Sequence, residues 1–218
     1  MIIAIDGPAG AGKSTVARLV AKRLGYLYLD TGAMYRALTL KVLDQGVDVK
    51  DCERIIKLAA SSAIGLINNS DGTLNVILDG VDVSLAIRQL RITKSVSDIA
   101  KIREVREIML KNQRELGSQG NAVLDGRDIG TVVFPDAEKK FYLDANLKER
   151  VNRRHKELKG LGQNITVESV DLDLSNRDKI DSSREFAPLK KADDAMYVDT
   201  TFLTIKEVVN KLLSYING

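Results

Sequence analysis

The 218-residue sequence contains one cysteine, Cys52, one histidine, His155, and no tryptophan. A lone cysteine cannot form an internal disulfide, which is typical of proteins that work in a reducing cytosol. One histidine and one cysteine are too few for a zinc site or for Ser-His or Cys-His catalysis. We therefore expect a cytoplasmic protein without such centres, with His155 at the surface.

An excess of charge of one sign and long apolar runs are also lacking. Charged residues make up 29%, but the formal net charge is only +3, whereas a general nucleic-acid binder usually has a strongly basic domain. No segment approaches the ~18 apolar residues of a membrane span. Asp6 ends the apolar run Met1–Ile5, and no basic residue precedes it, which favours a buried strand over a signal peptide. We expect a monomer with no nucleic-acid or membrane partner.

Short apolar runs that end in aspartate recur along the chain. Such runs, separated by helical patterns, indicate parallel strands buried on both faces. The predicted strands are Ile2–Asp6, Tyr26–Asp30, Asn121–Asp125, Lys140–Asp144 and Ala195–Asp199. The predicted helices are about Lys13–Leu24, Ala33–Gln45, Glu104–Leu116, Leu147–Leu158 and Thr204–Ile216. The alternation predicts an α/β fold, a doubly wound five-stranded parallel sheet with ligands at the carboxyl ends of its strands.

Two segments interrupt this alternation. Ile64–Asn68 and Leu74–Leu78 flank a turn and predict antiparallel strands, so we expect a small β insertion over 63–91. The polar interval Lys159–Asp173 contains two glycines and is compatible with a mobile lid. The predicted organisation is a core of 1–62 and 92–218, with a lid at about 150–175 and the insertion at 63–91.

A phosphate-binding motif follows the first predicted strand. All fixed positions of G-x-x-x-x-G-K-[ST] are present, between a strand and a helix. Glycines let successive N–H groups point at phosphate oxygens, and the helix adds its positive dipole end. Lys13 would reach the β- and γ-phosphates, and Ser14 would bind Mg²⁺. The predicted ATP-binding residues are Gly7, Pro8, Ala9, Gly10, Ala11, Gly12, Lys13, Ser14 and Thr15.

The phosphate loop by itself does not identify the reaction. A regulatory GTPase is the main alternative of another class, but D-x-x-G after the third strand and N-K-x-D are both missing. Another small P-loop kinase, acting on a different monophosphate or on a small hydroxyl metabolite, remains the second interpretation.

Two further motifs follow predicted strands. Asp30–Arg36 enters a helix, where Arg36 could clamp an acceptor phosphate and Tyr35 could pack on a base; a capped helix with a surface arginine fits equally well. Asp125–Asp128 follows the third strand. Asp125 occupies the position of an acid that orients Mg²⁺ through water, and Arg127 would project into the cleft. A simple Asp-Gly turn is the alternative.

Two groups of arginines complete the candidate site. Arg177, Asp181 and Arg184 would share one helix face, either as a surface ion-pair ladder or as ligands of a ribose and phosphates. Arg150, Arg153 and Arg154 precede the polar interval, as a solvated basic face or as a source of arginine fingers for the transferred phosphoryl group.

Together these stretches resemble the bacterial cytidylate kinase family over about residues 1–215. The most specific match is Asp125–Ala137, DGRDIGTVVFPDA. The others are Asp6–Lys13, Asp30–Arg36, Asp82–Ser84 with Ile87-Arg88, Val105–Glu107 and Ala187–Leu189 after Arg184.

The resemblance implies transfer of the γ-phosphate of ATP to CMP, and to dCMP, in pyrimidine nucleotide metabolism, with Mg²⁺ as the cofactor of ATP. It assigns the CMP phosphate to Arg36, Arg127 and Arg184, the cytosine to Ser97, Arg106 and Asp128, and the ribose to Arg177 and Asp181. Thr31 and Tyr35 also belong to the implied CMP-binding residues; Thr31 stands where some relatives have serine and keeps the hydroxyl. The implied catalytic residues are Lys13, Arg127, Arg153 and Arg184, although the lid varies within the family and leaves the choice of finger open.

Overall fold

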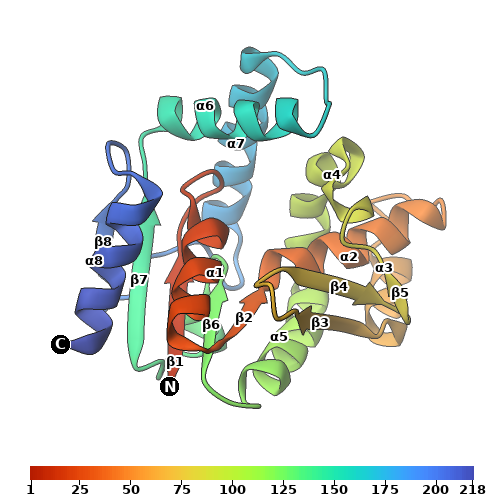
Figure 1. The fold of residues 1–218 in the computed structure, drawn as a ribbon. Helices are drawn as coiled ribbons and strands as arrows, with labels where there is room; N and C mark the ends of the chain where they lie inside the picture. The colour runs from red at the N-terminus through yellow and green to blue at the C-terminus, as the bar shows by residue number, and fades with distance from the viewer.

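The central sheet has five parallel strands in the order β2-β6-β1-β7-β8 (Figure 1). The computed structural model describes all residues, 1–218. Each strand begins within one residue of its predicted start and ends at the predicted aspartate, so the predicted fold class is confirmed. The strands are β1 (Ile2–Asp6), β2 (Leu27–Asp30), β6 (Ala122–Asp125), β7 (Lys139–Asp144) and β8 (Met196–Asp199).

Eight α-helices connect and cover the strands. Five were predicted within two residues at each end, but α3, α4 and most of α7 were not predicted as helices. The helices are α1 (Lys13–Leu24), α2 (Thr31–Asp44), α3 (Cys52–Ser61), α4 (Leu90–Ala100), α5 (Arg103–Gly117), α6 (Leu147–Gly160), α7 (Val167–Ser183) and α8 (Ile205–Asn217). No helix combines the length and apolar character that crossing a membrane requires.

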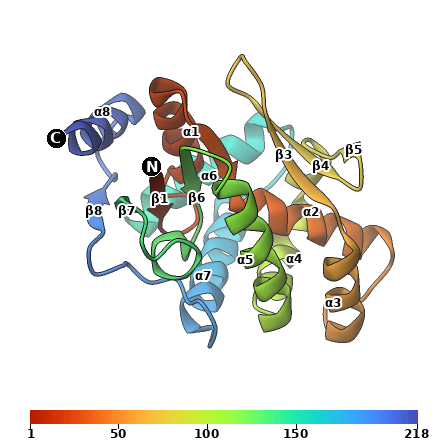
Figure 2. The ribbon, with the colours of Figure 1, turned by 90° about the horizontal axis from the view of Figure 1, so that it is seen from below.

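Both faces of the sheet are covered, which explains the continuous apolar runs. On one face, α1 and α8 pack over Ile3 and Ile5 of β1, with Val20 and Leu212 in the same core (Figures 1 and 2). On the other face, Ala4 packs with residues of a short π-helix, η2 (Ile129–Val133). Successive side chains of β1 point to opposite faces of the sheet, and here both faces are buried in a hydrophobic core rather than one facing solvent.

The predicted insertion contains a separate antiparallel sheet, β3-β4-β5, of which β3 (Ile64–Asn68) and β4 (Leu74–Leu78) were predicted exactly as observed and β5 (Val81–Asp82) was not. Val76 and Leu78 pack with residues of α2. The side chain of Asn68 makes two hydrogen bonds to the backbone of Tyr28, accepting from its N–H at 2.9 Å and donating to its C=O at 3.1 Å. This pair attaches the small sheet to β2, the edge strand of the large sheet.

The predicted polar interval is mostly helical, and its role as a mobile lid stays a prediction. Helix α6 runs through Gly160 and α7 begins at Val167, which leaves only 161–166 as a connection between them. Apolar contacts between Val151, Leu158 and Val170 hold the two helices together over Ala9. His155 is half-buried, and its Nε2 lies 3.1 Å from the carbonyl oxygen of Ile165.

Candidate active site

The phosphate loop lies between β1 and α1, with glycines where the backbone requires them. Gly7, Gly10 and Gly12 have φ values of 145°, 80° and 87°. A Cβ at Gly7 would stand 1.9 Å from the carbonyl oxygen of Leu143 on the neighbouring strand β7. Only glycine permits this turn and this approach, so the sequence forms a cradle of backbone N–H groups at the N-terminus of α1.

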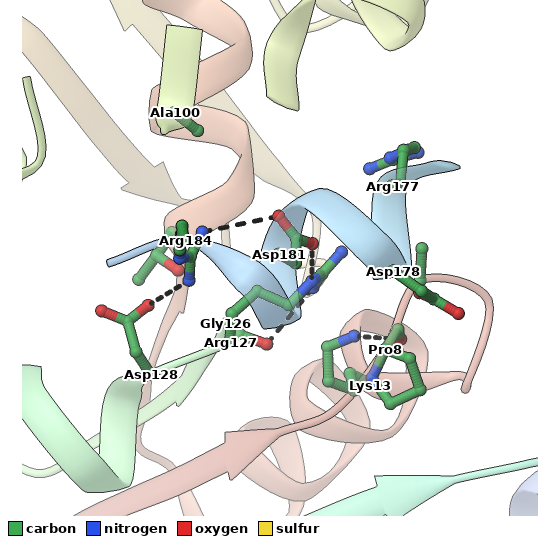
Figure 3. A network of polar contacts seen from close by, with 12 residues as sticks. Pro8, Lys13, Ala100, Gly126, Arg127, Asp128, Arg177, Asp178, Asp181 and Arg184 are labelled. Atoms are coloured by element: carbon green, nitrogen blue, oxygen red, sulfur yellow. Dashed lines mark hydrogen bonds and ion pairs between the residues drawn. The ribbon is translucent and has the colours of Figure 1, made fainter. Parts of the chain in front are cut away.

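Lys13 points back over the loop, and its Nζ donates to the carbonyl oxygen of Pro8 at 2.7 Å (Figure 3). Burial, reinforced by the nearby Arg127, lowers the pKa of the Lys13 ammonium group, and Asp125 and Asp6 partly offset this effect. A cation that is desolvated and faces another cation is stabilised when an anion binds beside it. The loop therefore presents a charge that a bound polyphosphate would neutralise.

The arginines of α6 adopt three different arrangements. Arg150 donates to the carbonyl oxygen of Ala9 at 3.1 Å and pairs with Asp178 at 2.5 Å, so it braces the phosphate loop against α7. Arg153, the predicted finger, bonds instead to the backbone and hydroxyl oxygens of Thr200, at 2.6 and 2.9 Å. Its role as a catalytic finger stays a prediction.

Arg154 is the arginine of α6 that reaches across the cleft. It donates to the hydroxyl of Thr93 on α4 at 3.2 Å, and beside it Gln163 donates to the carbonyl oxygen of Arg88 at 3.2 Å. The helical pair α6–α7 thus touches the segment next to the small sheet at two points. The sequence analysis grouped Arg154 with its neighbours and had no signal to separate them.

Asp125 lies at the carboxyl end of β6 and binds the hydroxyls of two other elements. Its Oδ2 accepts from Ser14 Oγ at 2.8 Å, and its Oδ1 accepts from Tyr28 Oη at 2.8 Å. Its backbone carbonyl accepts from Thr31 Oγ1 at 2.7 Å, so the Thr31 hydroxyl orients this strand end. Burial, with the nearby Asp30, raises the pKa of the Asp125 carboxyl group. The adjacent Ser14 and Asp125 oxygens are the hard ligands that Mg²⁺ prefers.

Three arginines and two aspartates form a ladder of ion pairs, of which Figure 3 shows the part from Asp128 to Arg127. Arg106 Nη2 donates to Asp128 Oδ2 at 2.5 Å. Asp128 Oδ1 lies 3.6 Å from Arg184 Nη2 (Figure 3). Arg184 Nη1 lies 3.4 Å from Asp181 Oδ1, and Asp181 Oδ2 accepts from Arg127 Nε at 2.9 Å. The three arginines outnumber the two aspartates, so the ladder carries one positive charge that no aspartate of the ladder offsets.

Arg177 adds a further cation beside the ladder. Burial, together with Arg127, lowers the pKa of its guanidinium to about 10, and its Nε has no hydrogen-bond partner. Arg184 lies one residue beyond α7 rather than on it, so the predicted single helix face was wrong in that detail. Its Nε donates to the carbonyl oxygen of Ala187, whose φ of 52° is costly for a residue with a Cβ.

The ladder ends in an enclosed polar cluster. Arg106, on α5, packs its guanidinium 5.3 Å from the ring centre of Tyr35 and donates to the carbonyl oxygen of Ala100 at 3.2 Å. Arg106, Asp128 and Ser97 are all buried. Arg106, Asp128 and Tyr35 therefore bring a guanidinium, a carboxylate and an aromatic ring together in one low-dielectric place, a combination suited to reading a flat polar ring. The role of Ser97 in this reading stays a prediction.

Arg36 lies apart from the ladder and pairs with Asp30 at 2.9 Å. Asp30 is also the N-cap of α2 and accepts from the N–H of Ala33 at 2.8 Å. The capped-helix interpretation is therefore correct. It leaves the phosphate role of Arg36 as a prediction, because an incoming phosphate would compete with Asp30 for the same guanidinium.

Charged side chains from three elements fix η2, the π-helix that follows Asp128. Asp6 accepts from the N–H groups of Ile129 and Gly130, both at 2.8 Å. At the other end, Arg114 donates to the carbonyl oxygens of Val132 and Val133, and Lys140 donates to that of Pro135. An acid at the N-terminus and bases at the C-terminus match the helix dipole. Burial raises the pKa of Asp6 to about 7, although these two amides and Lys13 oppose the shift.

Comparisons with known proteins identify the family. The model of the cytidylate kinase family matches residues 3–218. The chain belongs to the cytidylate kinase family. It is 51% identical to the cytidylate kinase of Clostridioides difficile over 217 residues, covering 100% of this chain and 98% of the relative. It is 49% identical to the cytidylate kinase of Bacillus cereus (strain ATCC 10987 / NRS 248), covering 99% and 96%.

A solved structure shows how widely the fold of this cytidylate kinase family member is shared. A shikimate kinase from Bacteroides thetaiotaomicron superposes with a TM-score of 0.51 at 12% identity, covering 100% of this chain and 99% of that protein. At this identity the likeness shows the fold alone. The family membership rests on the sequence relatives, and it confirms the resemblance predicted from the motifs.

Proposed function

We propose that this protein transfers the γ-phosphate of ATP to CMP, and to dCMP, releasing ADP and CDP or dCDP, in pyrimidine nucleotide metabolism. The observation that carries the proposal is the ladder, which runs from the buried Arg106–Asp128 pair to Arg127, a cation close enough to Lys13 of the phosphate loop to lower its pKa. Its surplus positive charge suits a monophosphate, and the buried pair at its far end suits a base.

The acceptor nucleotide occupies the ladder. Arg127 and Arg184, joined by Arg36 when it leaves Asp30, hold the CMP phosphate. Arg177 and Asp181 hold the ribose. Ser97, Arg106 and Asp128 read the cytosine edge, while Tyr35 packs beside the Arg106 guanidinium. The Asp128 carboxylate accepts from the N4 amino group, and Arg106 donates to the ring acceptors; uracil would present the opposite pattern.

The donor nucleotide occupies the phosphate loop, with the Gly7–Thr15 backbone around its phosphates. Lys13 exchanges the Pro8 carbonyl for phosphate oxygens. Ser14 and, through water, Asp125 hold Mg²⁺, which supplies Lewis-acid neutralisation of the phosphate oxygens. The oxygens on the page fit this ion, because Ser14 Oγ and Asp125 Oδ2 already lie 2.8 Å apart at the loop.

Transfer requires alignment more than covalent assistance. An oxygen of the CMP phosphate attacks the γ-phosphorus while the bond to the β,γ-bridging oxygen breaks, and Lys13, Arg127 and Arg184 offset the charge of the transferring group. An arginine of α6 acts as the finger. Arg153 is the sequence-based candidate, and Arg154 is the one that already spans the cleft. Closure of the α6–α7 lid excludes water and suppresses hydrolysis of ATP.

The proposed domain organisation separates the donor side from the acceptor side. Residues 1–62 and 92–218 form the kinase core, with the lid at about 150–175, and 63–91 form an acceptor-side insertion. We further propose that the protein acts as a cytoplasmic monomer, since a single chain supplies both halves of the cleft.

A panel of acceptors with ATP and Mg²⁺ tests the proposal. CMP, dCMP, UMP, AMP, GMP, shikimate and gluconate are offered, and ADP release is measured. We expect CMP and dCMP to give the highest kcat/KM. A preference for AMP or UMP would reject the cytidine assignment and keep the monophosphate kinase assignment, whereas a preference for a hydroxyl metabolite would reject both. ADP release that needs no acceptor would indicate a nucleotide hydrolase.

A further inference from the structure

Tyr28 is a buried residue of β2 that neither the phosphate-loop motif nor the acceptor motifs include. Its ring packs in the main core with Val123 and Phe141. Its hydroxyl leaves that core and donates to Asp125 Oδ1 at 2.8 Å. The other oxygen of the same carboxylate, Oδ2, accepts from Ser14 at 2.8 Å. Each carboxylate oxygen of Asp125 therefore has one hydroxyl partner. Ser14 belongs to the phosphate loop, whereas Tyr28 belongs to β2.

We propose that Tyr28 is a positioning residue for magnesium–nucleotide binding, which holds the Asp125 carboxylate so that Oδ2 stays on the Ser14 side. The proposal rests on the proposed function, because it assumes that Ser14 and Asp125 serve the Mg²⁺ of ATP. Tyr28 itself touches neither nucleotide nor ion and acts only through the carboxylate.

The Tyr28 hydroxyl is needed to orient the carboxylate because only the backbone of Asp125 is fixed by other contacts. Its backbone is paired with Ile5 of β1 and Asp30 of β2, and its carbonyl accepts from Thr31. The side-chain torsions are not set by these backbone bonds, and the last of them, which turns the carboxylate, is broad and has no strong intrinsic preference. Tyr28 and Ser14 together set that angle. A bound Mg²⁺ would engage the Ser14 hydroxyl, and Tyr28 would remain as the partner that keeps the orientation of the carboxylate.

Tyr28 is in turn held from outside the main sheet. The Asn68 side chain bonds both to its N–H, at 2.9 Å, and to its C=O, at 3.1 Å. Strand β2 is at the sheet edge, where backbone groups otherwise lack a neighbour. Because Asn68 ends β3, the small sheet on the acceptor side fixes the residue that orients the carboxylate on the donor side.

Equilibrium binding of ADP tests the proposal without turnover. Affinity for ADP is measured by calorimetry with excess Mg²⁺ and with a chelator, and the ratio of the two affinities is the magnesium gain. Tyr28→Phe keeps the ring and removes the hydroxyl, and we expect its magnesium gain to fall about tenfold. Its metal-free affinity should change less than about twofold, because no phosphate contact is lost. Tyr26→Phe is the matched control, since the Tyr26 hydroxyl contacts only the sulfur of Met1, at 4.0 Å.

The outcomes separate the two hypotheses. If the wild-type protein shows no magnesium gain, the Ser14–Asp125 assignment in the proposed function fails. If the wild type shows the gain and Tyr28→Phe keeps it in full, the role of Tyr28 is overturned while the proposed function stands. Equal losses with and without Mg²⁺ would also overturn it, since they would mark Tyr28 as merely structural. Should Tyr28→Phe not fold, Asn68→Ala replaces it, with a smaller drop in the same ratio expected and an unchanged ratio contradicting the proposal.

Discussion

The donor side of the cleft is built mainly from backbone, whereas the acceptor side is built from charged side chains. Eight consecutive residues, Gly7–Ser14, form the phosphate cradle, and Lys13 supplies its central charge. The acceptor ladder draws Arg106 from α5, Asp128 and Arg127 from the segment after β6, and Asp181 from α7. A backbone cradle tolerates many side-chain changes. A ladder shares each charge between two neighbours, so the loss of one member affects the next.

The largest expected effect is on the donor side. Lys13→Ala should lower kcat by about 10³-fold or more, because the ammonium follows the γ-phosphate into the transition state. CMP binding should persist, since the only hydrogen bond of the Lys13 ammonium group is to Pro8 and none joins it to the ladder residues proposed to hold CMP. Steady-state turnover and CMP binding by calorimetry check both halves. Near-normal turnover of the folded variant would reject the phosphate-loop assignment.

A smaller loss, confined to the acceptor, is expected from Arg184→Ala. The kcat/KM for CMP should fall about 100-fold while ATP affinity changes less than about twofold, because a charge-assisted phosphate contact is lost on one side only. Kinetics with each substrate varied in turn separate these effects. Arg103→Ala, which removes an exposed arginine paired with Glu107, is the matched control. If Arg184→Ala changed only thermal stability and left the kinetics intact, the ladder would be a structural ion-pair network without a role in CMP binding.

The ladder also predicts non-additivity. Combining Arg184→Ala with Asp181→Asn should lower kcat/KM for CMP clearly less than the two single losses predict when added as free energies. Each single variant already breaks the ion pair between Arg184 and Asp181, so the double variant breaks it only once. The measurement is a double-mutant cycle on kcat/KM for CMP. Additive losses would show that the two residues work independently.

Asp6→Asn should lower activity moderately, because Asp6 lies next to the phosphate loop on the donor side and bonds to the segment after Asp128 on the acceptor side. Asparagine offers one acceptor in place of two, so one of the Ile129 and Gly130 amides loses its partner and the segment after Asp128 loosens. We expect about a tenfold fall in kcat/KM for CMP with a smaller change for ATP. Initial rates over a grid of both substrates check this. A larger loss for ATP would mean that Asp6 serves the adjoining phosphate loop instead.

The smallest effect is expected from a charge outside both regions. Lys57 pairs with Glu53 on the exposed surface of α3. Lys57→Ala should leave kcat/KM for both substrates within about twofold, because exposed pairs contribute little. A larger change in kcat/KM would show that charges far from the ladder also influence catalysis.

Continuous patterns made the sheet and the donor side predictable from the sequence. Each strand ended in an aspartate, and the phosphate loop is one uninterrupted motif whose glycines have the positive φ values that the pattern implies. The small sheet was likewise predicted from two apolar runs around a turn. Here local sequence and final structure agree because the same residues determine both.

Contacts between distant segments could not be predicted in this way. Asp6 and Gly130 are 124 positions apart, and Asn68 meets Tyr28 across 40 positions, so no local spacing joins them. Most of α7 was not predicted because its apolar residues do not gather on one clear face, and it is held to α6 by a few apolar contacts such as Leu158 with Val170. Arg184 was placed on a helix that ends at Ser183. The family resemblance, rather than spacing, singled out Ser97, Arg106 and Asp128.

The ratio of kcat/KM for CMP over UMP, in the wild type and in Asp128→Asn, tests the central claim most directly. A buried carboxylate accepts from the cytosine amino group and repels the uracil carbonyl, while asparagine can present either its oxygen or its nitrogen to the base. We predict a high ratio in the wild type that falls at least about tenfold in Asp128→Asn, with uracil gaining and cytosine losing. A ratio that stays within about twofold would contradict the claim that the ladder ends in a site that reads the base.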